Sequence, residues 1–222
     1  MQKILGYSLL LLLLIGCIVT GTVGAETQSE NYFPLQVGNK WLFRVNAADT
    51  EFQMEYNAVS KETVDGQETI KVESVVNGLT SQTEYYEVTT QGIFTILRNL
   101  TVYEFHFNPK QIFLKYPVTI GQSWNQKGNF SDPAQKVSFQ YEQQCQYIAM
   151  EEVSVPAGTF KAVKLRITLT VTDGSYVEGY RYFSPNVGLI KEDLNLTLAN
   201  NKIKVQSELL RFEPGSSKNR PQ

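Results

Sequence analysis

The sequence predicts an all-β protein, a twisted antiparallel β-barrel or half-barrel of about 12 strands. The prediction depends on three observations. Apolar and polar residues alternate with a period of two, hairpin dipeptides separate the alternating runs, and the chain beyond residue 25 shows no convincing 3.6-residue period. An open sheet of this length would leave exposed edges, which closure or strong curvature avoids.

The clearest alternation lies within 160–172, where Val163 and Leu165 share one face and Lys164 and Arg166 share the other. Such a pattern is typical of a strand with one buried face and one solvent-exposed face. Asp-Gly and Asn-Gly pairs mark turns between the runs. The expected strands are 39–47, 51–63, 68–76, 81–89, 92–97, 101–107, 111–116, 122–126, 135–150, 160–172, 175–183, 188–194 and 201–212. In the last of these the parity breaks at Leu209-Leu210, which indicates a bulge.

Composition supports a globular chain and excludes several classes of function. The chain has 222 residues, of which 42% are hydrophobic and 19% charged, so one domain can bury a sizeable core. A formal net charge of -2 gives no basic excess for nucleic acid. One His and two Cys cannot supply a zinc-type site, and no phosphate loop or nucleophile elbow occurs. We expect no cofactor, no metal and no enzymatic activity.

The chain begins with a secretory signal pattern over residues 1–25. Lys3 precedes an almost wholly apolar stretch from Ile4 to Val19, and small residues follow it. We therefore expect an exported protein, in the cell envelope or secreted into the periplasm or medium. An uncleaved membrane anchor is the alternative, because the stretch is nearly as long as a membrane span.

Two cleavage signals compete at the end of this leader. Leu14-Ile-Gly-Cys17 resembles a bacterial lipobox, in which the cysteine is lipidated and anchors the protein to a membrane. Val23-Gly-Ala25 before Glu26 suits ordinary signal peptidase. We favour lipidation of Cys17 slightly, and keep free secretion as the alternative.

Beyond the leader, we expect a linker at 26–31, a single β domain at 32–212 and a disordered tail at 213–222. The pattern Pro-x-x-aliphatic-Gly-x-x-Trp occurs twice, ending at Trp41 and at Trp124. It raises the alternative of two similar halves, which are 32–110 and 111–212.

Both Trp residues are interpreted as plugs of the core, with ligand stacking as the alternative. Tyr103 and Phe105 are further candidates for ligand binding, because they belong to an aromatic cluster in the middle of the chain. Aromatic residues pack β cores, but they also line cavities for apolar ligands.

Cys145 and His106 are the reactive side chains of the predicted domain. Removal or lipidation of Cys17 leaves Cys145 without an intramolecular partner. Its parity with Tyr141 and Tyr147 predicts that it packs in the core as a small hydrophobe, with a reactive thiol as the alternative. His106 falls on the face opposite Phe105, beside Glu104, and we expect a surface pair there and no catalytic dyad.

Three separated motifs resemble a family of uncharacterised bacterial envelope proteins labelled TapB-like. They are Tyr32-Phe-Pro-Leu-Gln-Val-Gly-Asn-Lys-Trp41, Val155-Pro-Ala-Gly-Thr-Phe160 and Tyr182-Phe-Ser-Pro-Asn-Val-Gly-Leu-Ile-Lys191. The resemblance covers about residues 32–192. It implies a β-rich, barrel-like fold and an envelope address, and it implies no activity. Physically, motifs of Gly, Pro and aromatic residues define turns and their packing.

Three functions remain open at this point. The first is a non-catalytic binding or assembly component of the cell envelope, whose partner is a protein or an apolar ligand. The second is a carrier of a lipid or other apolar ligand, which requires an aromatic-lined cavity of at least ~300 Å³. The third is an unrecognised hydrolase, which requires facing titratable groups in a cleft.

Overall fold

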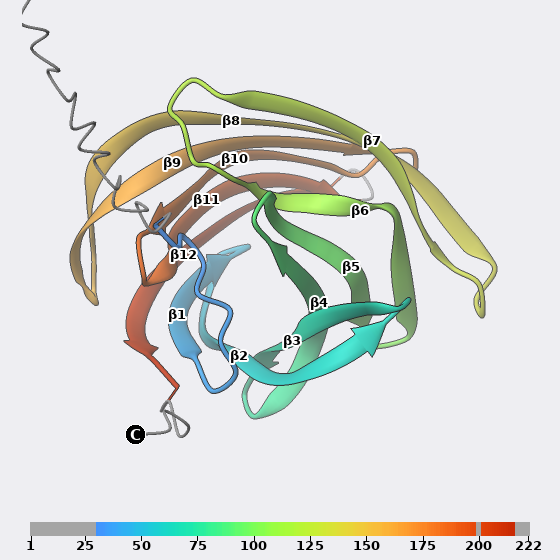
Figure 1. Cartoon of the computed structure of the whole chain (residues 1–222), viewed down its shortest axis with the longest axis horizontal. Helices are drawn as coiled ribbons and strands as arrows, with labels where there is room; N and C mark the ends of the chain where they lie inside the picture. The colour runs from blue at the N-terminus through green and yellow to red at the C-terminus, as the bar shows by residue number, and fades with distance from the viewer. Residues whose placement is uncertain (1–29, 199–200, 216–222) are drawn as a thin grey trace, which may run out of the picture.

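A computed structural model describes residues 30–198 and 201–215 of the chain. The predicted signal at 1–25, with Cys17, and most of the predicted tail lie outside these residues. Within them the fold is all-β, and twelve strands form a closed antiparallel barrel (Figure 1). The strands are β1 (Lys40–Ala47), β2 (Thr50–Val64), β3 (Gln67–Val76), β4 (Leu79–Thr89), β5 (Gly92–Leu100), β6 (Tyr103–Lys115), β7 (Ser123–Asp132), β8 (Val137–Val155), β9 (Gly158–Val171), β10 (Tyr176–Ser184), β11 (Gly188–Leu198) and β12 (Asn201–Glu213).

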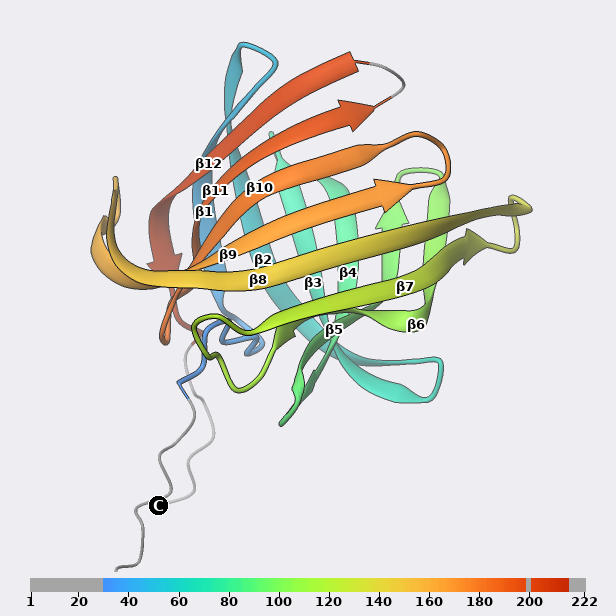
Figure 2. The same ribbon diagram turned by 90° about the horizontal axis from the view of Figure 1, so that it is seen from above.

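The barrel has the simplest up-and-down topology. Each strand pairs with its neighbours in the chain, and β1 pairs with β12 to close the sheet. Figure 2 shows the strands tilted around the wall, with the β8–β9 hairpin bending at its end. The bulge predicted near the C-terminus is confirmed, because Phe43 pairs with Leu209 and Leu42 with Arg211, which leaves Leu210 unpaired.

One strand prediction was wrong. Residues 101–107 and 111–116 were expected as two strands, but they form the single strand β6. Pro109 interrupts the alternation and has no N–H for a ladder. The barrel accommodates it at a bulge against β5, where the register shifts between Thr95 and Leu97. The predicted boundary between two halves, at 110/111, lies inside this strand.

The pairing of β6 with β7 is the shortest in the barrel wall. It covers only His106 to Asn108 on β6. Beyond this pairing, the side chain of Gln126 on β7 takes the place of the backbone hydrogen bonds that are missing between the two strands. Its Oε1 accepts from the Ile112 amide at 2.8 Å, and its Nε2 donates to the Lys110 carbonyl at 2.8 Å. A side-chain amide thus satisfies backbone groups that would otherwise lack partners.

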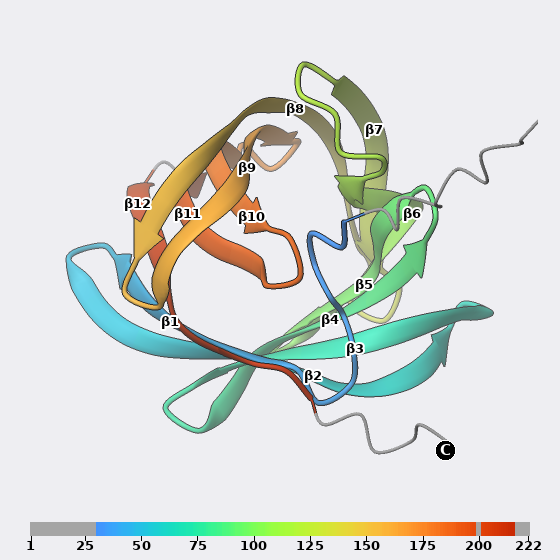
Figure 3. The same cartoon turned by 60° about the vertical axis from the view of Figure 1, so that its left-hand side comes forward.

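The predicted turn motifs meet at one end of the barrel and close it. The segment before β1 crosses this opening (Figure 3), and its Phe33 packs on Trp41 and Phe183. Trp41 is fully buried, and its Nε1 donates to the carbonyl of Val187 at 2.6 Å. Gly188 follows with a φ of +99°, and a Cβ at this position would lie 2.8 Å from the Phe33 ring.

The remaining turn motif joins the same end from another hairpin. The Ala157 amide, in the turn between β8 and β9, donates to the Leu209 carbonyl at 3.0 Å. Phe160, at the end of this motif, packs against the core. At the start of the predicted tail, Glu213 belongs to β12, and the Gly215 amide donates to Asn39 Oδ1 at 2.6 Å.

Candidate functional site

The barrel interior contains a cavity of about 290 Å³ above this closed end. Phe113, Tyr86 and Leu189 lie at its base, near the packed aromatic residues of the closed end. Its aliphatic wall reaches toward the opposite end of the barrel along β9, β10 and β11, and consists of Ile167, Leu169, Val177, Leu194 and Leu196. Four charged side chains also line it, and they are Glu84, Arg98, Arg181 and Glu192.

Strand alternation places these charged groups inside the barrel. Arg181 shares its parity with Val177 on β10, and Glu192 shares its parity with Leu194 on β11. Between Val177 and Arg181, Gly179 allows β10 to approach β11 closely. A Cβ on Gly179 would lie 2.1 Å from the Asp193 carbonyl oxygen, with φ +147°, so only glycine fits there.

The four charges form two ion pairs across neighbouring strands. Arg98 places Nε at 2.8 Å and Nη2 at 2.7 Å from Glu84 Oε1. Arg181 Nε donates to Glu192 Oε1 at 2.8 Å. Isolated charges are very costly to bury, and paired charges rarely stabilise a core more than apolar residues would. Stability alone therefore does not account for two such pairs inside a barrel.

Hydroxyl groups complete the coordination of both carboxylates. The Tyr86 hydroxyl donates to Glu84 Oε2 at 2.6 Å, and the Ser207 hydroxyl donates to Glu192 Oε2 at 3.0 Å. Burial alone would raise the pKa of Glu84, but Arg98 and the Tyr86 hydroxyl together hold it below its usual value. Burial and the neighbouring Glu84 raise the pKa of Tyr86 well above its usual value. Glu84 is therefore ionised and Tyr86 is neutral at neutral pH.

A pair of amides extends this polar layer across the barrel. Gln111 Nε2 donates to Gln143 Oε1 at 2.7 Å, and Gln143 Nε2 donates to the Ile112 carbonyl at 2.7 Å. Both side chains are buried. The interior thus consists of an aromatic closed end, a polar layer and an aliphatic wall, in that order along the barrel.

Two larger hollows lie on the outer face of β7, β8 and β9, with volumes of about 370 Å³ and 770 Å³. Outward side chains of these strands line them, including Gln144, Arg166 and Glu142. The Arg–Glu pairs described above lie in neither of them. We favour the interior cavity as the candidate site because it joins buried charges to an apolar wall.

The Trp residues proposed for ligand stacking lie outside the lining of this cavity. Trp41 packs at the closed end, where its ring stacks on Phe212 with centroids 5.3 Å apart. Trp124 is buried against Tyr147, with ring centroids 5.1 Å apart. Trp41 fits the interpretation as a core plug, whereas Trp124 also lines the hollow of about 370 Å³ and its buried Nε1 has no hydrogen-bond partner in the described residues, so both interpretations stay open for it.

Tyr103 and Phe105 belong to a separate aromatic cluster on β6, β7 and β8. Tyr103 is 41% exposed and stacks on the buried Phe105, with centroids 5.3 Å apart. Phe105 packs against Phe130 and Phe139. Arg98 connects this cluster to the cavity, since its guanidinium lies 5.4 Å from the ring centre of Phe107.

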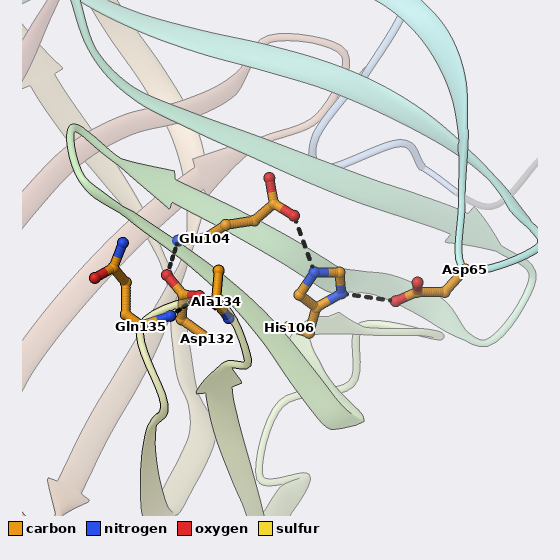
Figure 4. A network of polar contacts seen from close by, with 6 residues as sticks. All are labelled: Asp65, Glu104, His106, Asp132, Ala134 and Gln135. Carbon is orange, nitrogen blue, oxygen red and sulfur yellow. Dashed lines mark hydrogen bonds and ion pairs between the residues drawn. The ribbon is translucent and has the colours of Figure 1, made fainter.

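His106 lies on the outer face, as its parity predicts, between two carboxylates (Figure 4). Its Nδ1 is 3.0 Å from Asp65 Oδ2, and its Nε2 is 3.1 Å from Glu104 Oε1. Asp65 comes from the turn between β2 and β3, which the sequence did not place beside β6. Burial opposes protonation, but hydrogen bonds to Asp65 and Glu104 raise the pKa of His106 above its usual value. When the ring is protonated, both of its nitrogens donate to these carboxylates.

Cys145 lies in the core, which confirms the predicted parity. It is 4% exposed, and burial raises the pKa of its thiol to about 11. A thiol with this pKa is unreactive at neutral pH. Cys17, the predicted site of lipidation, lies outside the described residues.

Among residues 30–198 and 201–215, no group of three or more His, Cys, Asp or Glu side chains could hold a metal ion. The same residues contain no helix long and apolar enough to cross a membrane.

The sequence reasoning missed the four charged residues of the cavity. A signal was present for two of them. Glu192 shares its parity with Leu194 and Leu196, and Arg181 with Val177, so each is a charge on an apolar face. The pairing of Arg98 with Glu84 was harder to find, because the register of β4 on β5 shifts at Tyr85/Tyr86.

No protein-family model matches the chain, and no curated protein matches it in sequence. The resemblance to the TapB-like family therefore stays a prediction. Two solved structures are similar in fold. One is a "putative lipoprotein" from Parabacteroides distasonis, with 15% identity, a TM-score of 0.48, and coverage of 83% of this chain and 99% of that one. The other is a "putative exported protein with YmcC-like fold" from Bacteroides fragilis, with 14% identity, a TM-score of 0.49, and coverage of 83% and 100%. Similarity at this level carries no conclusion about function.

Proposed function

We propose that this protein is an exported, non-catalytic β-barrel that binds a small ligand with an apolar body and a polar end inside its interior. The leader at residues 1–25 supports export. The observation that carries the binding function is the interior cavity of about 290 Å³, whose wall is aliphatic and whose polar layer holds two arginines. Its volume is close to the lower limit of typical ligand pockets, ~300 Å³.

The cavity favours binding over the two rival functions. A purely structural assembly component would have a filled interior, which this barrel lacks at its polar layer. A hydrolase would need a carboxylate free to act as acid or base. Both oxygens of Glu84 and of Glu192 already accept hydrogen bonds, so neither carboxylate is available without rearrangement.

Native mass spectrometry of the protein purified from its own host tests the proposal. We expect a reproducible adduct of small-molecule mass on the wild-type protein. Val177→Trp fills the cavity from its wall, so the adduct should fall at least ~10-fold. The matched control is Val88→Trp on the 48% exposed Val88, which should retain the adduct. A bare mass for the wild-type protein, or equal adducts on the two variants, would contradict binding inside the barrel.

A further inference from the structure

The two arginines of the cavity carry more hydrogen-bond donors than the surrounding groups use. A guanidinium has five N–H groups in a planar fork. Among the described residues, Arg98 uses Nε and Nη2 on Glu84, and Arg181 uses only Nε on Glu192. In the described part of the chain, Nη1 of Arg98 and both Nη atoms of Arg181 therefore form no hydrogen bond.

The carboxylates beside them already accept other hydrogen bonds. Glu84 and Glu192 each accept from an arginine on one oxygen and from a hydroxyl on the other. The carbonyl oxygen of Gln143 accepts from Gln111. The two ion pairs are thus neutral in formal charge and leave arginine donors free, and an incoming group with acceptor oxygens could bind them.

The arginines face the cavity more than their partners do. The side chains of Arg98 and Arg181 are 31% and 22% exposed, whereas those of Glu84 and Glu192 are 7% and 11% exposed. Aromatic rings help to orient both guanidiniums, with Phe107 at 5.4 Å from Arg98 and Phe113 at 5.3 Å from Arg181. The free edges of two oriented forks therefore border the cavity.

The two cations also lie within electrostatic range of each other. Burial acts most strongly and lowers the pKa of Arg98, Glu84 and Tyr86 together raise it above its usual value, and the charge of Arg181 again acts to lower it. An anion between the two guanidiniums would relieve this repulsion. Carboxylates match a guanidinium fork in geometry and charge, and such bonds are about twice as strong as neutral ones.

From this geometry we infer that the ligand is a single-chain anionic amphiphile, with its carboxylate held by Arg98 and Arg181 and its alkyl chain along Leu169, Val177, Leu194 and Leu196. This inference rests on the proposed binding function and specifies its ligand class. The head would lie at the polar layer, and the chain would follow the aliphatic wall toward the end of the barrel opposite the Trp41 plug.

Calorimetric titration with decanoate, decanol and decylamine at neutral pH tests the head group. The three probes have the same alkyl chain and differ only in charge and hydrogen bonding. We expect decanoate to bind the wild-type protein at least ~10-fold more tightly than decanol, and decylamine most weakly. Equal affinity for all three probes would overturn the inference of an anionic head group but leave the proposed binding function intact. Tightest binding of decylamine also overturns it. Binding of none overturns both.

Paired variants separate the head-group contact from general damage to the fold. R181Q/E192Q removes one cavity ion pair without leaving an unpaired buried charge. It should lower the affinity for decanoate at least ~10-fold and change the affinity for decanol less than ~2-fold. The matched control is R44Q/E208Q, which removes an ion pair of 2.8 Å on the outer face of the barrel. This variant should change neither the affinity for decanoate nor the affinity for decanol. Unchanged decanoate binding by folded R181Q/E192Q would overturn the inference.

R181K provides a second test should the double variant fold poorly. Lysine keeps the charge beside Glu192 but replaces the fork with a single ammonium. The affinity for decanoate should then fall several-fold, while the affinity for decanol should stay the same. Wild-type affinity for decanoate in R181K would show that the fork does not bind the head group.

Discussion

His106 shows how a single residue can connect distant parts of this chain. Its ring bridges Glu104 on its own strand and Asp65 in the β2–β3 turn, 41 positions away. Neither the spacing nor the composition of the sequence indicates that Asp65 would lie there. Parity predicted only that His106 faces outward beside Glu104, and the structure confirms this part. The contact with Asp65 depends on the tilt of a long hairpin.

The contacts of His106 make part of the stability of the barrel pH-dependent. The pKa of His106 is higher in the folded protein than the ordinary value of 6.5. The ring thus stabilises the fold fully below pH 6.5, and this contribution is lost as pH rises through the raised pKa. His106→Gln should lower the free energy of unfolding below pH 6.5 by about 0.5 kcal/mol, because the carboxylate partners are more than half exposed and screened by solvent.

Urea unfolding of both proteins at a pH below 6.5 and again in alkaline solution measures this effect. The difference between wild type and variant should shrink at the higher pH. Asp65→Asn should reproduce part of the effect, because it removes one of the two carboxylates. A difference that is the same at both pH values would mean that protonation of His106 contributes nothing to the fold.

At the scale of elements, the alternation of side chains predicted most strands, and local sequence explains where it failed. The alternation of apolar and polar residues is still recognisable across a bulge such as the one at Leu210, because only one extra residue interrupts it. Around Pro109, several residues leave the ladder together, so the pattern divided β6 into two. The same pairing gap hid the role of Gln126, since a polar residue on a strand gives no sign that it bonds to a neighbouring backbone.

The contact between β6 and β7 beyond their short pairing, here called the seam, should depend on the side-chain amide of Gln126. Gln126→Leu has a similar size but leaves the Ile112 amide and the Lys110 carbonyl without their partner. Leaving buried backbone groups unpaired costs about 1–3 kcal/mol, and we expect the free energy of unfolding to fall by that amount. Hydrogen exchange of the Ile112 amide should also become faster than in the wild-type protein.

Gln140→Leu is the matched control for the seam. Gln140 is exposed on β8, and its side chain makes no hydrogen bond with the described residues, so this change should alter stability by less than ~0.5 kcal/mol. If both variants lose the same stability, the seam does not rely on Gln126.

At the scale of the whole molecule, the sequence motifs and the cavity occupy different regions. The motifs that end at Trp41, Phe160 and Lys191 meet at the closed end, where they determine turns and packing. They predicted the fold because turn chemistry is local. The cavity was not predicted, because its ion pairs join strands whose register is set by bulges. A charge at an apolar parity position was the single sign in the sequence, and it pointed to Arg181 and Glu192.

Attachment of the barrel to a membrane should depend on Cys17 alone. If Cys17 is lipidated, the intact mass will begin at this residue and include acyl chains, and the protein will sediment with membranes. Cys17→Ser should move the exported protein to the soluble fraction and leave the unfolding of the barrel unchanged, because the change precedes the predicted linker. Cys145→Ser is the control, since Cys145 is buried in the core and its replacement should affect stability without releasing the protein. An intact mass that begins at Glu26 would instead establish ordinary secretion.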